Sequence, residues 1–483
     1  MKRNFSRITM MSLSLLLAVG IVLSACTAPV SKAVDEDAKP VTDGKIDKDP
    51  EEDPSPAGNP NTDSALAGAI AGVHQLVKKH WPHMDKVWPG YDYKNHNMII
   101  VDFDEMMEVR EACVLNVDTM RKLTVQEYQN LQLPQVGGYA ELKFEGKSSI
   151  AMGVDSNDLE SGSEAEIYTV ATHELVHFYY QGEAKFGIET SRAQSYPIDP
   201  APRLYRQMLF QRLIDAYDHP DQEAEYLAKA KYWLEKYKSE FAEEYQAIRS
   251  TDIIESTARY SENLANVIGD DLDEKAFVEA MQPMILRDSI FESADGESYE
   301  IGFLAGLILD RQGVDWKKDF YKADKGVEEL LLEKVEAQAE EPDETFASKL
   351  KAKIEQSNQE NESHLASIIK AKDDKSIAFL KLDVSESMAS FGATGAIFFD
   401  DKEVMTGYQC SYLVGDQRID LNGISVIQDM EGYNLYLIIP LDMEYSLEGN
   451  VLRVDSAQLK ADGIKVEQSQ QDGRTILLVK VTE

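Results

Sequence analysis

The sequence predicts an α+β protein in which a small β-sheet precedes a mostly helical region, and an all-β, sandwich-like module follows. Short apolar runs at 97–103, 139–144 and 148–154 favour three strands. Apolar residues then recur every three to four positions through most of 163–330, which indicates helices. After residue 375, short alternating runs separated by Gly, Asp and Asn are typical of a β-sandwich. The length of 483 residues is sufficient for two or three folded units.

The charge balance restricts the classes of partner. The chain has 86 acidic and 49 basic residues, with a formal net charge of −37. Binding to nucleic acid depends on clustered Lys and Arg, so this composition excludes a nucleic-acid partner. An anionic lipid surface would also repel the chain, so we expect any membrane attachment to be covalent or by insertion.

The first 26 residues have the three parts of a secretory signal peptide. A basic start is followed by an apolar run at 10–23, which is short for a membrane span, and then by the small-residue ending Leu-Ser-Ala-Cys. This ending resembles the bacterial lipobox. The resemblance implies cleavage before Cys26, acylation of Cys26, and an extracytoplasmic protein anchored by lipid to the bacterial cell membrane. The alternative is an ordinary signal peptide with an incidental cysteine.

Residues 27–63 are expected to form a disordered tether. They hold ten acidic residues, four basic residues and six of the sixteen prolines, with almost no bulky apolar side chains. Such a composition cannot bury enough surface to offset the entropy of ordering. The remaining cysteines, Cys113 and Cys410, lie far apart in the sequence, so one disulfide is possible but a disulfide framework is not.

Beyond the tether, the chain divides into three further regions. A helix is expected at 64–79, and Ser163 with Glu166 forms a predicted capping box at the start of another helix. Helical periodicity continues from about 202 to 313. We place one domain at 64–330, a helical connector at 331–375 and the β module at 376–483.

The helix that begins near Ser163 carries the sequence His173-Glu174-Leu175-Val176-His177, an HExxH motif. Residues four apart lie on one face of a helix, so both imidazoles can bind the same metal ion. Glu174 projects at about 100° from His173 and can act as a general base toward a water molecule. Two imidazoles and one carboxylate with an open position form a common catalytic zinc set, which predicts one Zn²⁺ per chain.

The third metal ligand must come from elsewhere in the chain. A metzincin extension would need Gly at position 180 and His at position 183, where this chain has Tyr180 and Glu183. The donors that remain downstream are Asp218, His219 and the acidic residues of the segment 253–262. Among these we select Glu255.

The motif and the segment E-S-T-A-R-Y-S-E, which begins at Glu255, together resemble the gluzincin type of zincin metallopeptidase, in particular the aminopeptidase N family. In that family the ligand Glu opens a helix reading E-G-x-A-x-Y-x-E, which this chain matches at Glu255, Ala258, Tyr260 and Glu262. Ser256 replaces the glycine, and the gap from the second histidine to Glu255 is longer than usual in the family. The resemblance covers roughly 64–330 and implies a zinc peptidase with a zincin-like catalytic unit.

A second segment of the same resemblance begins at Tyr299. The sequence Tyr-Glu-Ile-Gly at 299–302 is similar to the family's Y-E-x-G, whose tyrosine donates a hydrogen bond to the oxyanion, so the resemblance implies this role for Tyr299. Its alternative role is to begin a core helix. Tyr260 is a competing donor, although its offset from Glu255 turns it about 140° away. Arg259 could bind the Glu255 carboxylate, contact substrate or form an ordinary surface salt bridge.

The expected function is a membrane-anchored, extracytoplasmic zinc peptidase that acts on a peptide or protein substrate. The strand at 148–154 could border the cleft and pair with an extended peptide, or it could be an ordinary strand of the sheet. The family's G-x-M-E-N segment, which binds the substrate amino terminus, is absent. The alternatives are a non-catalytic binding lipoprotein on a zincin scaffold and a zinc hydrolase of a non-peptide amide. For 376–483 we expect a structural or partner-binding role.

Overall fold

The computed structural model describes residues 60–481, apart from 105–107, 158, 183–193, 288–293, 386, 388–390 and 433. The predicted signal peptide and Cys26 lie outside the described residues, as does most of the predicted tether. The end of the tether differs from the prediction, because helix α2 (Pro60–His80) begins four residues earlier than expected. Within the described ranges, no helix is both long and apolar enough to cross a membrane.

The first sheet has five strands in the order β3-β2-β1-β5-β4. Strands β1 and β5 are parallel, and the other neighbouring pairs are antiparallel. The three predicted strands are confirmed, and β2 and β3 are two further strands that were not predicted. The strands are β1 (Asn97–Phe103), β2 (Val109–Leu115), β3 (Met120–Lys122), β4 (Tyr139–Phe144) and β5 (Lys147–Val154).

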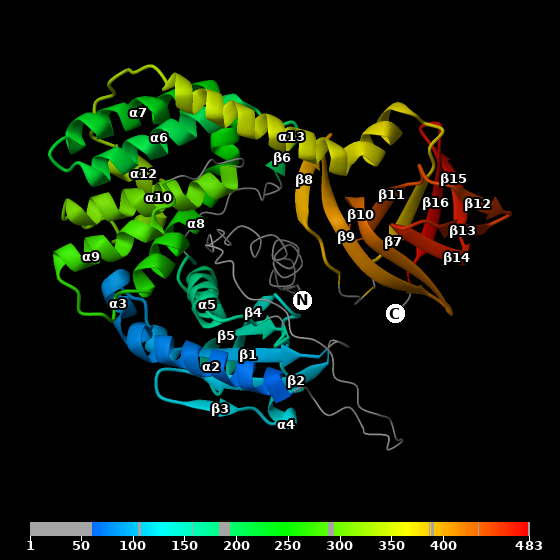
Figure 1. The fold of residues 1–483 in the computed structure, drawn as a ribbon, viewed down its shortest axis with the longest axis horizontal. Helices are drawn as coiled ribbons and strands as arrows, with labels where there is room; N and C mark the ends of the chain where they lie inside the picture. Colours follow the sequence, from blue (N-terminus) through cyan, green and yellow to red (C-terminus); the bar gives the residue numbers. More distant parts are fainter. Residues whose placement is uncertain are drawn as a thin grey trace, which may run out of the picture.

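Strand β1 lies at the centre of this sheet and is buried along its whole length. Alternate side chains enter different cores, since successive residues of a strand point to opposite faces. Met98 and Ile100 pack in the main core with Val73 of α2 and Leu175 of α5. Ile99 and Val101 join a smaller core on the other face. Each fully buried aliphatic side chain contributes about 1.5–3 kcal/mol. This packing fixes α5 on the sheet (Figure 1).

The middle of the chain is helical, as predicted. Helix α5 (Ser163–Tyr179) begins differently from the expectation: Gly162 precedes it with φ 102°, and the Ser163 hydroxyl accepts a bond from the amide of Glu160. The predicted capping box is therefore wrong. The longer helices that follow are α6 (Pro200–Asp218), α7 (Glu223–Glu240), α8 (Ala242–Ala265), α9 (Glu274–Met281), α10 (Ala294–Arg311) and α13 (Glu344–Asp373). The short ones are η2 (Trp81–His83), α3 (Met84–Val87), η3 (Tyr93–Asn95), α4 (Val125–Tyr128), η4 (Gln282–Met284), α11 (Phe320–Ala323) and α12 (Val327–Leu331).

The C-terminal module is one curled sheet rather than the two packed sheets of the predicted sandwich. Its longest strands, β9 and β10, pair with register shifts around Ile424. Such irregularities bend a strand, so a continuous sheet can curl around its own core. The strands are β7 (Phe379–Asp383), β8 (Gly395–Phe399), β9 (Lys402–Val414), β10 (Gln417–Glu431), β11 (Asn434–Pro440), β12 (Tyr445–Glu448), β13 (Val451–Asp455), β14 (Leu459–Lys465), β15 (Glu467–Gln471) and β16 (Arg474–Lys480).

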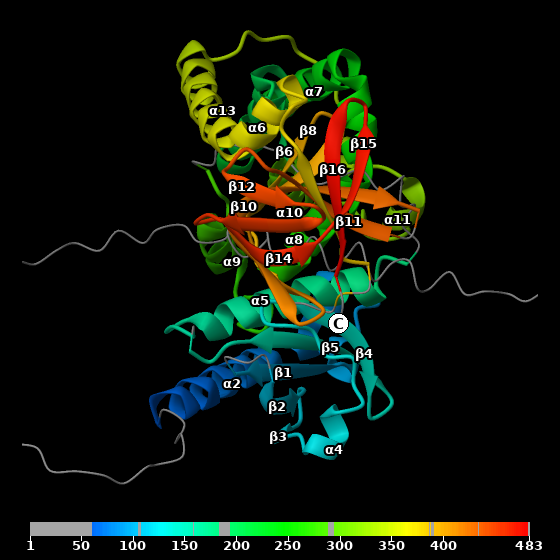
Figure 2. The same ribbon diagram turned by 90° about the vertical axis from the view of Figure 1, so that its right-hand side faces the viewer.

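This second sheet also includes a strand from the region between α5 and α6. Strand β6 (Gln194–Ser195) pairs in parallel with β8. The side chain of Asn358, on α13, binds both the backbone N–H and the carbonyl of Ile198, at 2.7 and 3.2 Å. Helix α13 runs from the helical region to the second sheet (Figure 1), and Figure 2 shows this sheet in front, with the first sheet below and α6 and α7 above. The module is thus tied directly to the chain just before α6.

The two cysteines within the described residues are both free and buried. Cys113 lies on β2 of the first sheet and Cys410 on β9 of the second. The possible disulfide between them is therefore not formed.

Candidate metal centre

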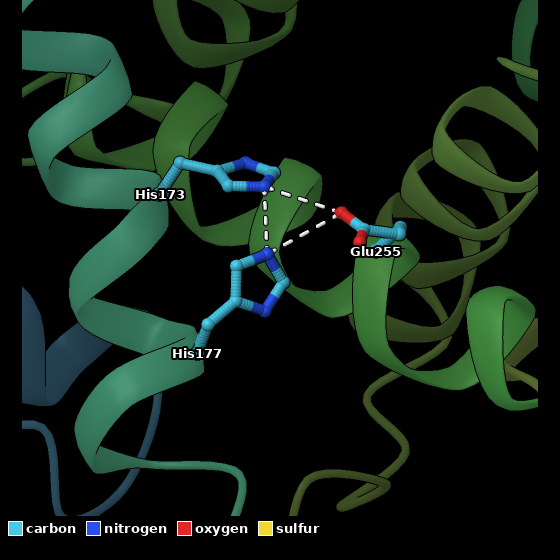
Figure 3. A group of neighbouring side chains, drawn as sticks. All are labelled: His173, His177 and Glu255. Atoms are coloured by element: carbon cyan, nitrogen blue, oxygen red, sulfur yellow. Dashed lines mark hydrogen bonds and ion pairs between the residues drawn. The ribbon is translucent and has the colours of Figure 1, made fainter. Parts of the chain in front are cut away.

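Helices α5 and α8 bring three of the predicted ligands together. The Nε2 atoms of His173 and His177 lie 2.9 Å apart, and Oε2 of Glu255 lies 3.3 Å from each of them. Figure 3 shows the two imidazoles on α5 directed toward the carboxylate on α8. Two other candidate donors lie elsewhere: Asp218 pairs with Arg287 at 2.9 Å, and His219 bonds to the backbone of its own helix.

The outer nitrogen of each imidazole faces an oxygen acceptor. Nδ1 of His173 lies 2.7 Å from Oε2 of Glu262, and Nδ1 of His177 lies 2.8 Å from Oε1 of Gln181. The orientation of the Gln181 amide is set by its NH₂ group, which donates to the carbonyl of Ile254 at 2.7 Å. Each Nδ1 therefore carries the proton, since Glu262 and the Gln181 oxygen only accept.

This arrangement fits a metal cation. When both rings are neutral, each with its single proton on Nδ1, the Nε2 lone pairs of His173 and His177 and the Glu255 carboxylate converge on one point. Three ligand atoms, one from each residue, lie within 4.8 Å of one another. Converging lone pairs repel one another, and a cation between them removes that repulsion. Two imidazoles and a carboxylate are also a donor set that suits Zn²⁺.

The electrostatics around His173 are dominated by carboxylates. Burial lowers the pKa of His173, but Glu262 and Glu255 outweigh it and hold the pKa well above its ordinary value. Burial raises the pKa of Glu262, but His173 and Arg259 lower it by more, so the net shift of this pKa is downward. Glu262 therefore carries a negative charge beside His173 in a buried position.

Glu174 lies beside the three ligands but is not one of the group. Its side chain is buried, and burial raises the pKa of its carboxyl, while His177 and His173 act in the opposite direction. The Tyr139 side chain, at the start of β4, hydrogen-bonds this carboxyl. A buried carboxylate with a raised pKa beside a candidate metal-binding group has the properties of a general base.

Tyr299 lies against the same site. Its ring stacks on that of His173, with centroids 5.8 Å apart and an interplanar angle of 19°. Helices α8 and α10 approach each other closely here. A Cβ atom on Gly302 would lie only 2.0 Å from the Cβ of Ser256. Gly302 thus makes room for Ser256, which stands where the aminopeptidase N motif has a glycine. The close approach places Tyr299 near the metal-binding group.

Tyr260 and Arg259 both pair with carboxylates other than Glu255. Tyr260 is fully buried, donates its hydroxyl to Asp310 and packs edge-on against Trp316, so it is not a second donor at the site. Arg259 hydrogen-bonds Glu262 and, at 3.0 Å, Glu300. Arg259 therefore acts on His173 through Glu262, and its ion pairs are largely buried rather than on the surface.

The strand predicted to border the cleft has no free edge. Strand β5 pairs with β1 on one side and with β4 on the other. The edge of the sheet on this side is β4, which carries Tyr139. The expectation that residues 148–154 offer backbone groups to a peptide is therefore wrong, and the edge strand next to β5 is β4.

Sequence reasoning missed the roles of Glu262 and Gln181. Glu262 was part of the quoted motif, and its position seven residues after Glu255 places it two helical turns along the same face. That spacing, with the need of each imidazole for an Nδ1 partner, was a usable signal. Gln181 follows His177 by four residues, but its role depends on the contact between α5 and α8, which the sequence does not reveal.

Comparison with protein-family models, with curated proteins and with solved structures gave no match to this chain.

Proposed function

We propose that the protein is a zinc-dependent peptidase of the gluzincin type, anchored by lipid outside the cytoplasm of a bacterium. The observation that carries the proposal is the convergence of His173, His177 and Glu255 with both Nδ1 atoms bonded to oxygen acceptors. A site with this donor set, and with Glu174 beside it, supports hydrolysis of an amide bond. The N-terminal lipobox resemblance supports the anchor at Cys26.

Each residue of the site has a distinct task in this proposal. His173, His177 and Glu255 hold one Zn²⁺, which when bound polarises a carbonyl group and makes water more acidic. Glu174 accepts the proton from the attacking water and passes it to the leaving amine. The Tyr299 hydroxyl donates a hydrogen bond to the oxygen that becomes negative during the attack.

The position of β4 supports a peptide as the substrate. An extended peptide can pair with the open side of an edge strand through main-chain hydrogen bonds. Strand β4 is that edge, and its first residue, Tyr139, contacts the general base Glu174. A peptide aligned along β4 would therefore pass close to the reacting groups. A non-peptide amide would be hydrolysed by the same residues but would make no use of this edge.

The test is hydrolysis of a mixed peptide library by the full-length mature chain, with zinc content measured on the same sample. We expect one zinc per chain, hydrolysis that stops on chelation and returns on adding Zn²⁺, and new peptide termini. Zinc without peptide cleavage, but with release of amines from cell-wall fragments, would favour the non-peptide hydrolase. A chain that binds no zinc and cleaves neither substrate would favour the non-catalytic binding protein.

A further inference from the structure

Arg206 lies in the interior of the helical region, at the junction of three helices. It comes from the middle of α6 and is 1% exposed. Its guanidinium binds both carboxylate oxygens of Asp252 on α8, at 2.6 and 3.2 Å. Such two-point pairing fixes the relative orientation of the two groups, which a lysine could not do in the same way.

The same guanidinium also contacts α10. Its Nε atom lies 2.7 Å from Oε2 of Glu297, and its Nη2 atom lies 3.4 Å from the hydroxyl of Ser298. The Ser298 hydroxyl in turn donates to Asp252 at 2.6 Å. One cation therefore joins α8 to α10, and the serine closes the network between them.

The contacted residues are neighbours of the candidate active-site residues. Asp252 precedes Glu255 by one helical turn, and Ser298 is adjacent to Tyr299. Glu255 is a predicted metal ligand, and Tyr299 stacks on His173. The network thus holds the turn of α8 that carries the ligand and the turn of α10 that carries the tyrosine.

We propose that Arg206 is a positioning residue that sets the placement of Glu255 and Tyr299 around His173. This inference rests on the proposed function, because it assigns Arg206 to the geometry of that metal centre. Burying charged groups is costly, and a buried ion pair is weak evidence for a stabilising role. What the network provides is a fixed separation between the two helices that carry Glu255 and Tyr299.

The test compares Arg206→Lys with Arg311→Lys in the full-length mature chain, using Co²⁺ as the metal probe. Arg206 lies over the ring of Tyr237, at 5.3 Å. Arg311 is a matched control because it lies over the ring of Tyr217, at 5.2 Å, and binds backbone carbonyls, but at the far end of α10. Far-ultraviolet circular dichroism and urea unfolding establish the fold and stability of each variant. The measured quantities are the Co²⁺ dissociation constant and the visible absorption spectrum of the bound ion.

We expect Arg206→Lys to weaken Co²⁺ binding by about tenfold and to change the absorption spectrum, because support of metal ligands typically contributes 10–100-fold to affinity. Arg311→Lys is expected to leave both unchanged, even where it lowers stability. Ser298→Ala removes a single hydroxyl, so it replaces Arg206→Lys in the test if that variant does not fold. It should also weaken Co²⁺ binding and change the absorption spectrum. Folded variants at Arg206 or Ser298 that bind Co²⁺ as the wild type does, with the same spectrum, would overturn the proposal.

The activity measurement separates this inference from the proposed function. If Arg206 acts through Tyr299, the loss of kcat caused by Arg206→Lys should be smaller in a Tyr299→Phe background than in the wild type. Equal losses of kcat in both backgrounds would show that Arg206 does not act through Tyr299. A wild-type chain that binds Co²⁺ but hydrolyses nothing refutes the peptidase and leaves the Co²⁺ comparison valid, whereas a wild type that binds no Co²⁺ refutes both.

Discussion

Nδ1 of His173 lies 2.7 Å from Oε2 of Glu262, so a second carboxylate stands directly behind the first histidine of the motif. The contact fixes the ring and makes Nε2 a stronger metal donor, because the negative charge stabilises the proton on Nδ1. Arg259 holds Glu262 from the other side. The orientation of His173 is thereby determined by α8, the helix that also supplies Glu255.

Replacing Glu262 with Gln should weaken zinc binding by about 10–100-fold, because the amide can still accept the Nδ1 proton but lacks the charge. Affinity is measured by competition with a chromogenic chelator. Glu243→Gln, at an exposed position near the start of the same helix, is the control and should bind zinc as the wild type does. Equal affinity of Glu262→Gln and the wild type would show that the contact does not support the ligand.

Tyr299→Phe should lower kcat by about 10²-fold with little change in zinc affinity, since an oxyanion donor acts mainly in the transition state. The measurement is steady-state kinetics on a peptide that the wild type cleaves. Tyr260→Phe is the matched tyrosine variant, and its hydroxyl is bonded to Asp310, away from the ligands. It should change stability but not the chemical step. A larger loss of kcat in Tyr260→Phe than in Tyr299→Phe would reverse the two assignments.

Glu328 should make the stability of the helical region depend on pH. Burial, with repulsion from Asp252 and Glu329, raises the pKa of this carboxyl from 4.5 to about 8. Between these values the native state retains a proton that the unfolded state has released. Stability should therefore fall as pH rises from about 4.5 to about 8, by at most ~1.4 kcal/mol per pH unit, and then level off.

Glu328→Gln mimics the protonated form and should remove this dependence. Urea unfolding at a series of pH values from 5 to 9 measures it, with Glu336→Gln at an exposed position as the control. The free energy of unfolding of Glu328→Gln relative to the wild type should rise with pH up to about pH 8. Parallel pH profiles for the two proteins would show that Glu328 is not protonated in the native state.

Cys26→Ala should release the protein from the membrane. Two acyl chains give stable anchoring, and without an acylated cysteine the apolar segment is the remaining attachment. In detergent phase partition of cells that express each form, the wild type should enter the detergent phase. The variant should enter the aqueous phase if its signal peptide is still cleaved, so the size of the product is measured in parallel. A cleaved variant that stays in the detergent phase would contradict the lipid anchor.

The sequence predicted those parts of the fold whose pattern is local. Strands β1 and β4 were placed to the residue, because uninterrupted apolar or alternating runs bounded by turn residues are strong signals. Strand β10 was not predicted, because the irregular pairing near Ile424 interrupts its alternation. The curling of the second sheet and the pairing of β6 with β8 depend on contacts between residues distant in sequence. They could not be inferred from short segments of the sequence.

The candidate site shows the same division. The i, i+4 spacing predicts that His173 and His177 share one face of a helix, and the structure brings their Nε2 atoms together. Selecting Glu255 required a resemblance, because several acidic residues follow the motif. The role of Gln181 could not be predicted, since its amide bonds across to the backbone of α8. Contacts between helices that are distant in sequence determine the rest of the site.

The central claim is that Glu174 activates water for hydrolysis at the zinc site. The most direct test is Glu174→Gln, assayed for peptide hydrolysis and zinc content together, with Glu166→Gln on an exposed face of the same helix as the control. The proposed mechanism predicts one zinc per chain in both variants, a loss of kcat of at least about 10²-fold in Glu174→Gln, and wild-type kcat in the control. A Glu174→Gln variant that retains zinc and full peptidase activity would contradict it.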